Sequence, residues 1–259
     1  MDKMPCIPVK ITDKKWADKL QDGSIFMRAL HEYGSWSAIE RAQTNADIMK
    51  SGVQGDAGEG IVRRVDPKIG DDFFNLFDPE VRAAMKDCMY IDNDHYQYYK
   101  VFCMYGLTYL LDEAKYEKPD ERLEEFGDTA VVILYPDEFL KRVIKALHEK
   151  YGDNVSFRLD EVHYYPDDYY GFLDEFCKRA SFAWQNEMRM RIALLDENNV
   201  IVGEDGLPRK RLVQDINPIN LEIGDIRDIS IQIPVHDLIM LNLPEIIANP
   251  IFQSDNDET

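Results

Sequence analysis

An alternation of polar and apolar positions close to residue 190 is the most informative pattern in the chain. If Phe182 to Leu195 is extended, successive side chains point to opposite faces of the strand. One face then carries Gln185, Glu187, Arg189 and Arg191. The other face carries large apolar side chains that belong to a hydrophobic core. The polar series lies either on a solvated surface, as cross-strand ion pairs commonly do, or on the floor of a site.

The apolar spacing elsewhere predicts the remaining main elements. Runs of β-branched and aromatic residues predict strands at Ile7–Ile11, Ser24–Met27 and Thr129–Leu134, in addition to Met188–Leu195. Apolar residues at helical spacing behind a proline predict a helix over Glu138–Lys150.

Further elements follow from shorter patterns. A helix is predicted between the first two strands, with Trp16, Ala17 and Leu20 on one face. Another helix is predicted over Tyr170–Trp184, and Leu194–Val213 has the pattern of a β-hairpin.

Together these elements predict a single α+β domain over residues 1–252, with a mixed, mostly antiparallel sheet and flanking helices. Residues 43–72 are rich in glycine and aspartate and predict a long loop or insertion with brief strands. Residues 253–259 are acidic, and we expect them to form a flexible tail. A hydrophobic fraction of 45% with 11% aromatic residues is typical of a folded chain.

The charge of the chain limits its partners. With 30 basic and 49 acidic residues the formal net charge is −19, which repels nucleic-acid phosphates and anionic membranes. The sequence also lacks an apolar run of the roughly 20 residues that a membrane helix needs, and a signal-peptide core at its start. We therefore expect a cytoplasmic protein with no membrane partner. The four cysteines lack paired short spacing, so we expect no metal site.

A glycine-rich stretch offers a second, weaker candidate site. Asp56 and Glu59 lie in this stretch. Together with Lys178 they could form the site of a metal-dependent nuclease, which is an alternative interpretation of the function. The negative net charge argues against that alternative. His31 follows a predicted strand, and it is the one histidine that we expect to lie in a site. Familiar phosphate-binding loops, dinucleotide fingerprints and hydrolase motifs do not occur in the sequence.

Several stretches resemble an uncharacterised family of bacterial, phage and plasmid proteins. They are FGDTAVVILYPDEFLKRV, LEIGDIRDIS and a spaced motif of Lys178, Trp184, Gln185, Glu187 and Arg189. The chain is also similar to a larger domain-of-unknown-function family, whose early D-P-F-E motif corresponds to residues 56–59. The resemblance covers most of the chain and implies a defence, counter-defence or toxin setting, without an activity.

A more distant similarity is to ADP-ribosyltransferases. The chain opens with strand, helix, glycine and strand, and Gln185-Asn186-Glu187 matches the Gln-x-Glu signature at the start of a late strand. This resemblance implies an ADP-ribosyltransferase-like fold with NAD or a related nucleotide as ligand. It implies that Glu187 stabilises an oxocarbenium-like transition state and that Gln185 positions the acceptor.

The same resemblance implies cations around the cofactor phosphates. The family carries an arginine or histidine on its opening strand, and this chain departs from that pattern. Lys10 and Arg28 are the nearest candidates for the position. Arg189 and Lys178 complete the expected cofactor-binding set.

A non-catalytic protein is the competing interpretation. In it, the acidic surface and the tyrosine-rich segment HYYPDDYYGF engage a partner protein, as an inhibitor or binding protein in bacterium–phage conflict. The sequence leaves open whether the protein is an enzyme and whether it serves the host or the mobile element.

The net charge generates a direct test. We expect no duplex-DNA binding at physiological salt, because neutralisation of phosphates supplies most non-specific affinity and this chain has an excess of acids. An anisotropy titration with random duplex checks it. Micromolar binding that weakens steeply with salt would contradict the prediction and favour the nuclease alternative.

Overall fold

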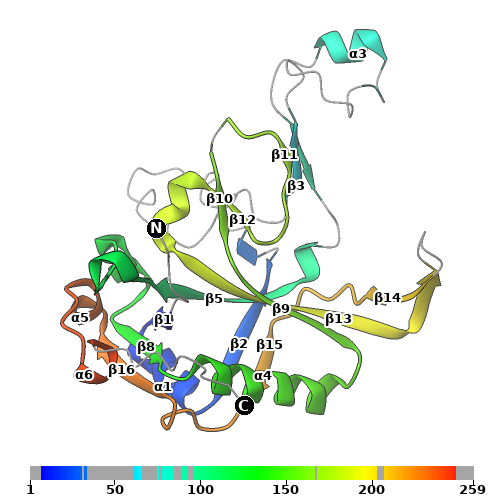
Figure 1. Ribbon diagram of the computed structural model, residues 1–259. Helices are drawn as coiled ribbons and strands as arrows, with labels where there is room; N and C mark the ends of the chain where they lie inside the picture. Colours follow the sequence, from blue (N-terminus) through cyan, green and yellow to red (C-terminus); the bar gives the residue numbers. More distant parts are fainter. Residues whose placement is uncertain are drawn as a thin grey trace, which may run out of the picture.

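A computed structural model of the chain describes residues 7–30, 32–33, 61–65, 75, 78–84, 89–92, 96–166, 168–202 and 207–248 (Figure 1). Within these residues the fold is α+β, with a nine-stranded main sheet whose pairings are all antiparallel. The predicted class of a mostly antiparallel sheet with helices beside it is confirmed. No helix in the described ranges is long and apolar enough to cross a membrane.

The main sheet is built from segments spread over the whole described chain. Its strands are β1 (Ile7–Thr12), β2 (Ser24–Ala29), β5 (Lys100–Leu107), β8 (Thr129–Ile133), β9 (Val155–Glu161), β13 (Glu187–Val202), β14 (Pro208–Leu212), β15 (Ile219–Glu222) and β16 (Ser230–Pro234). The path runs β14-β13-β5-β1-β8-β16, while β9 pairs with β13 and β15 pairs with β2.

Helices and smaller sheets surround this sheet. The α-helices are α1 (Lys14–Gln21), α3 (Pro79–Ala84), α4 (Pro136–Tyr151), α5 (Val235–Ile239) and α6 (Glu245–Ala248). The 3-10 helices are η3 (Tyr96–Tyr98), η4 (Leu111–Glu113), η5 (Glu121–Phe126) and η6 (Ala180–Gln185). The short strands are β3 (Ile61–Val65), β4 (Met89–Asp92), β6 (Tyr109–Leu110), β7 (Lys115–Tyr116), β10 (His163–Tyr165), β11 (Gly171–Phe172) and β12 (Cys177–Arg179). Strands β11, β3 and β4 form a small sheet that projects from the body, with α3 beyond it (Figure 1).

The sheet divides at β5. One edge of β5 pairs with β13, but the other edge is shared between two strands that pair with its two halves. Val101 lies opposite Arg28 of β2, and Tyr105 lies opposite Val9 of β1. The segment Phe102–Met104 between them pairs with neither strand. We call this division the fork.

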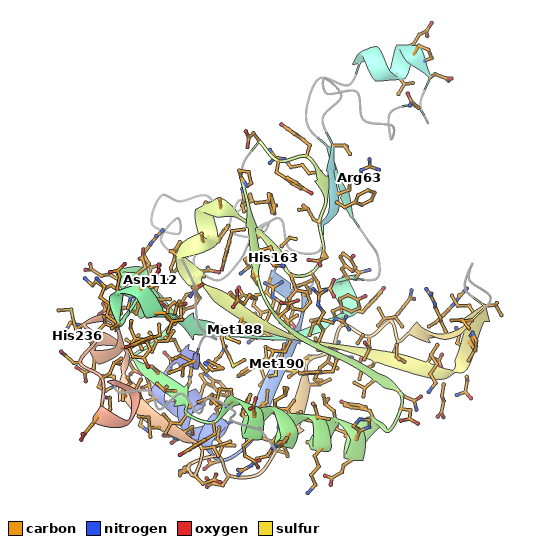
Figure 2. All side chains as sticks on the ribbon, viewed as in Figure 1. Arg63, Asp112, His163, Met188, Met190 and His236 are labelled. Atoms are coloured by element: carbon orange, nitrogen blue, oxygen red, sulfur yellow. The ribbon has the colours of Figure 1, made fainter. Side chains whose placement is uncertain are left out.

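Two hydrophobic clusters pack on the two faces of the main sheet, since β8 contributes Val131 and Ile133 to one and Ala130 and Val132 to the other. The first cluster joins Met27 and Phe102 to Val143 of α4 and to Met190 of β13. Figure 2 shows Met188 and Met190 on the side of the sheet that faces α4. The second cluster surrounds β1 and β8 and includes residues of α5. Both clusters exclude water, so burial of apolar surface stabilises the sheet from both faces.

The predicted strands at Ile7–Ile11, Ser24–Met27, Thr129–Leu134 and Met188–Leu195 are confirmed, as is the helix over Glu138–Lys150. The β13–β14 hairpin is confirmed as well, with a register shift inside it. In the first helix Ala17 and Leu20 are buried, whereas Trp16, predicted on the same helical face, is 47% exposed.

The predicted helix over Tyr170–Trp184 is wrong. The segment contains β11, a turn, β12 and η6 instead. The carboxylate of Asp174 accepts hydrogen bonds from the backbone N–H of Phe176 and from the Cys177 thiol, which holds the chain in a turn. Aspartate competes in this way with helical hydrogen bonding. Phe176 is fully buried, with the Arg158 guanidinium 4.1 Å from its ring centroid.

Some predictions lie outside the described residues. These are His31, Asp56, Glu59, the 253–259 tail and the 43–72 stretch apart from β3.

Gly127 generates a stability prediction. Its φ is +146°, and a Cβ there would lie 2.1 Å from the backbone carbon of Thr12. Gly127→Ala should therefore lower the free energy of unfolding by about 3 kcal/mol or more. Alanine would be strained at this φ, and its Cβ would clash with main-chain atoms that cannot move aside. Urea unfolding monitored by circular dichroism measures it.

Gly152→Ala is the matched control. Gly152 also has a positive φ of +56°, but nothing lies within 4 Å of an added Cβ. The free energy of unfolding should fall by about 1–3 kcal/mol, from backbone strain alone, because Gly152 has φ +56° and ψ −133°. Equal losses in the two variants would contradict the packing argument.

Candidate functional site

A cavity of about 1150 Å³ opens at the fork. Its walls come from β1, α1 and β2 on one side, from the unpaired part of β5 at the floor, and from the η5–β8 connection on another side. The cavity lies where β1 and β2 pair with opposite ends of β5 and leave the middle of that edge without a strand.

The cavity brings together most of the residues predicted from sequence. Its lining includes Lys10, Arg28, Lys178, Gln185 and Glu187. Arg189 is 1% exposed and does not line the cavity. Arg189 instead lies behind Glu187 and contacts its carboxylate.

Glu187 is held by two cations. Its Oε2 accepts a hydrogen bond from Lys178 Nζ at 2.6 Å, and its Oε1 accepts one from Arg189 Nε at 2.7 Å. Lys178 Nζ also donates to Gln185 Oε1 at 2.9 Å. All of these side chains are less than one-tenth exposed. A buried charge needs such partners, since an unpaired one is strongly destabilising.

The two cations fix the charge of Glu187. Burial by itself would raise the pKa of its carboxyl, but the charges of Arg189 and Lys178 hold that pKa well below its usual range. The carboxylate therefore stays ionised at any physiological pH. It can act as a fixed negative charge or as a hydrogen-bond acceptor, and not as a proton donor.

A strained residue aims Gln185 and Glu187 at the cavity. Asn186 between them has a φ of +36°, a left-handed conformation that asparagine tolerates better than most residues. Its side-chain amide donates to the Gly106 carbonyl at 2.5 Å and to Thr108 Oγ1 at 3.0 Å. The Gly106 N–H donates in return to the Asn186 carbonyl at 2.8 Å. The turn from η6 into β13 is thereby fixed to β5.

Lys10 occupies the fork itself. Its Nζ donates to the carbonyl of Cys103 at 2.8 Å and lies 4.7 Å from the centroid of the Phe102 ring. Burial lowers the pKa of Lys10 from its ordinary value, with Cys103 and Glu187 acting in the opposite direction. The same environment raises the pKa of Cys103 to about 12, chiefly through burial. Cys103 is therefore a thiol at neutral pH and not a nucleophile.

The rim of the cavity contains groups that the sequence did not indicate. Trp16 and Phe26 line it from α1 and β2, and Glu124, Glu125 and Asp128 line it from the η5–β8 connection. Gly127 holds that connection against the end of β1. In the sequence, the Gly127-Asp128 pair before a predicted strand could have indicated a turn at this place. Only the fold shows that this turn lies beside β1.

Among the described residues there is no group of three or more His, Cys, Asp or Glu side chains that could hold a metal ion. Cys103 and Cys177 are free thiols.

Comparisons of the chain with protein-family models, with curated proteins and with solved structures find no match.

The Glu187 cluster generates a pH-dependent prediction. Glu187→Gln should lower the free energy of unfolding at pH 7 by about 3–5 kcal/mol, because Lys178 and Arg189 lose their buried counter-charge. A carboxyl whose pKa is depressed by folding stabilises the protein above its unfolded pKa, and this contribution is lost as pH falls. The difference between wild type and variant should therefore shrink below about pH 4.5.

Chemical unfolding of both proteins between pH 3 and pH 7 provides the measurement. Glu124→Gln is the matched control, since Glu124 lines the same cavity with a side chain that is 53% exposed. Its effect should stay under about 1 kcal/mol. If Glu187→Gln lowers the free energy of unfolding only slightly, or by the same amount at every pH, the charge of Glu187 is not coupled to folding.

Proposed function

We propose that the cavity binds NAD or a related nucleotide and that the protein is ADP-ribosyltransferase-like. The observation that carries this proposal is the gathering of Glu187, Gln185, Lys10, Arg28 and Lys178 in one cavity, because the sequence resemblance singled out the same residues. A volume of about 1150 Å³ exceeds the 300–1,000 Å³ typical of small-molecule pockets, which suits a dinucleotide.

Four cations and five acids line the cavity, and the cations are the groups that support an anionic ligand. Lys10, Lys19 and Arg28 line the cavity from three different elements in a chain whose net charge is −19. Arg28 is exposed enough to contact a ligand, with a side chain that is 40% accessible and an ion pair to Glu32 at 2.8 Å. Phosphate groups bind such arginines through charge-assisted hydrogen bonds.

The proposed reaction breaks the bond between ribose C1′ and the nicotinamide nitrogen. The bonding electrons leave with nicotinamide and the ribose becomes oxocarbenium-like. An acceptor nucleophile then attacks C1′ and releases its proton to water. Glu187, ionised throughout, faces the developing positive charge, and the Gln185 amide orients the acceptor.

Binding without turnover is the second candidate. Both oxygens of Glu187 already accept hydrogen bonds from cations, which leaves the Lys178–Glu187–Arg189 cluster with a net positive charge. Such a cluster favours an anion more than a developing cation. The partner-protein interpretation is compatible with this candidate, since Tyr169 and Phe172 of the tyrosine-rich segment are exposed. The defence, counter-defence or toxin setting stays a prediction.

Arg28→Gln tests the binding proposal. Calorimetric titration with NAD should give an affinity at least about tenfold lower than wild type, because a charged hydrogen bond to phosphate is lost. The melting temperature should change little, since Arg28 lies outside the buried cluster. Arg227→Gln is the control, as Arg227 is similarly exposed and does not line the cavity. Equal affinity of wild type and Arg28→Gln would contradict this site for the ligand.

Nicotinamide release separates the two candidates. If the protein is a transferase, Glu187→Gln should slow release by about 10² to 10³ under conditions where circular dichroism shows it folded. NAD binding by wild type without nicotinamide release, in the presence of candidate acceptor proteins, would support the non-catalytic candidate instead.

A further inference from the structure

Two large aromatic side chains are left half-exposed at the rim of the cavity. Trp16 on α1 and Phe26 on β2 are each 47% exposed, and both line the cavity. Large aromatic rings lose hydrophobic stabilisation when they stay in contact with water. Their position on a concave surface, on two different elements, is typical of a ligand site.

Each of these rings has a cation beside it that also lines the cavity. Lys19 Nζ lies 4.7 Å from the centroid of the Trp16 ring, and the Arg28 guanidinium carbon lies 5.5 Å from that of Phe26. Lys15, outside the cavity lining, also approaches Trp16 at 5.2 Å. A ring offers a stacking surface to a planar base, and the neighbouring cation offers a contact to a phosphate.

The two rings are carried by rigid elements. Ala17 and Leu20, which follow Trp16 on α1, are buried in the first hydrophobic cluster. Phe26 lies opposite Asn220 in the β2–β15 pair. The start of β2 is fixed by Gly23, whose missing side chain allows the backbone of Gly224 to pack against it. A ligand therefore loses little affinity to ordering of the protein.

We propose that Trp16 and Phe26 form a base-binding subsite and that the ligand is a nucleoside diphosphate attached to a sugar. The base stacks at the rim, the phosphates contact Lys19 and Arg28, and the terminal sugar lies toward Glu187 and Gln185. This inference rests on the proposed nucleotide function and adds the class of ligand. It excludes a simple sugar phosphate as the main ligand, because such a molecule uses the cations and leaves both rings exposed.

Calorimetric titration of the full chain with two probes tests the subsite. ADP-ribose carries a base, whereas ribose 5-phosphate has the sugar and a phosphate without one. Wild type should bind ADP-ribose at least about tenfold more tightly than ribose 5-phosphate. Trp16→Ala and Phe26→Ala should each weaken ADP-ribose binding by about fivefold or more and leave ribose 5-phosphate binding unchanged.

Phe172→Ala is the matched control, because Phe172 is 69% exposed on β11, outside the cavity lining. It should leave both affinities unchanged. If wild type binds the two probes equally, the subsite is overturned whatever the variants do. If it prefers ADP-ribose but neither rim variant weakens that preference, the subsite is overturned while the proposed nucleotide function stands. If neither probe nor NAD binds, the proposed function and the subsite both fail.

Discussion

The buried carboxylate of Glu187 is the constraint on which the candidate site depends. It connects Lys178 on β12 with Arg189 on β13, and Lys178 extends the network to Gln185 on η6. Each of these groups is unfavourable alone in a buried position and becomes acceptable through the others. The hydrogen bonds that place the candidate site residues therefore also stabilise the local fold. A change in one member alters stability and ligand contact together, which is why the variants that separate these roles lie at the rim.

The fork in the sheet provides the space for this site. If a single strand paired with this edge of β5 along its whole length, the edge would be filled and no cavity would form there. Instead the two strands pair with opposite ends of β5, and Lys10 enters the gap between them. Hydrophobic clusters on both faces of the sheet hold the strands around this gap in place. The site is thus a consequence of topology, since its residues come from separate parts of the chain.

The sequence was informative where local pattern and tertiary burial agree. The alternation in β13 predicted both its apolar face and the polar series that contains Glu187, because a strand has the same period in any fold. It failed at Tyr170–Trp184, where the Asp174 side chain forms a turn that apolar spacing does not reveal. The sequence also did not show that Trp16 stays exposed, because helical spacing predicts a shared face but not which edge of that face meets a cavity. Arg189 was correctly grouped with Glu187, but only the packing shows that it supports the carboxylate from behind.

The hydrogen bond from Lys10 to the Cys103 carbonyl has a second consequence, which concerns self-association. An unpaired stretch of strand is a template for pairing with another chain, and the gap between β1 and β2 leaves such a stretch on β5 without a strand partner. The Lys10 ammonium satisfies the carbonyl that an incoming strand would use, and a strand that displaced it would leave a charge poorly solvated. The same side chain that offers a cation to a ligand thus closes the edge against other polypeptides.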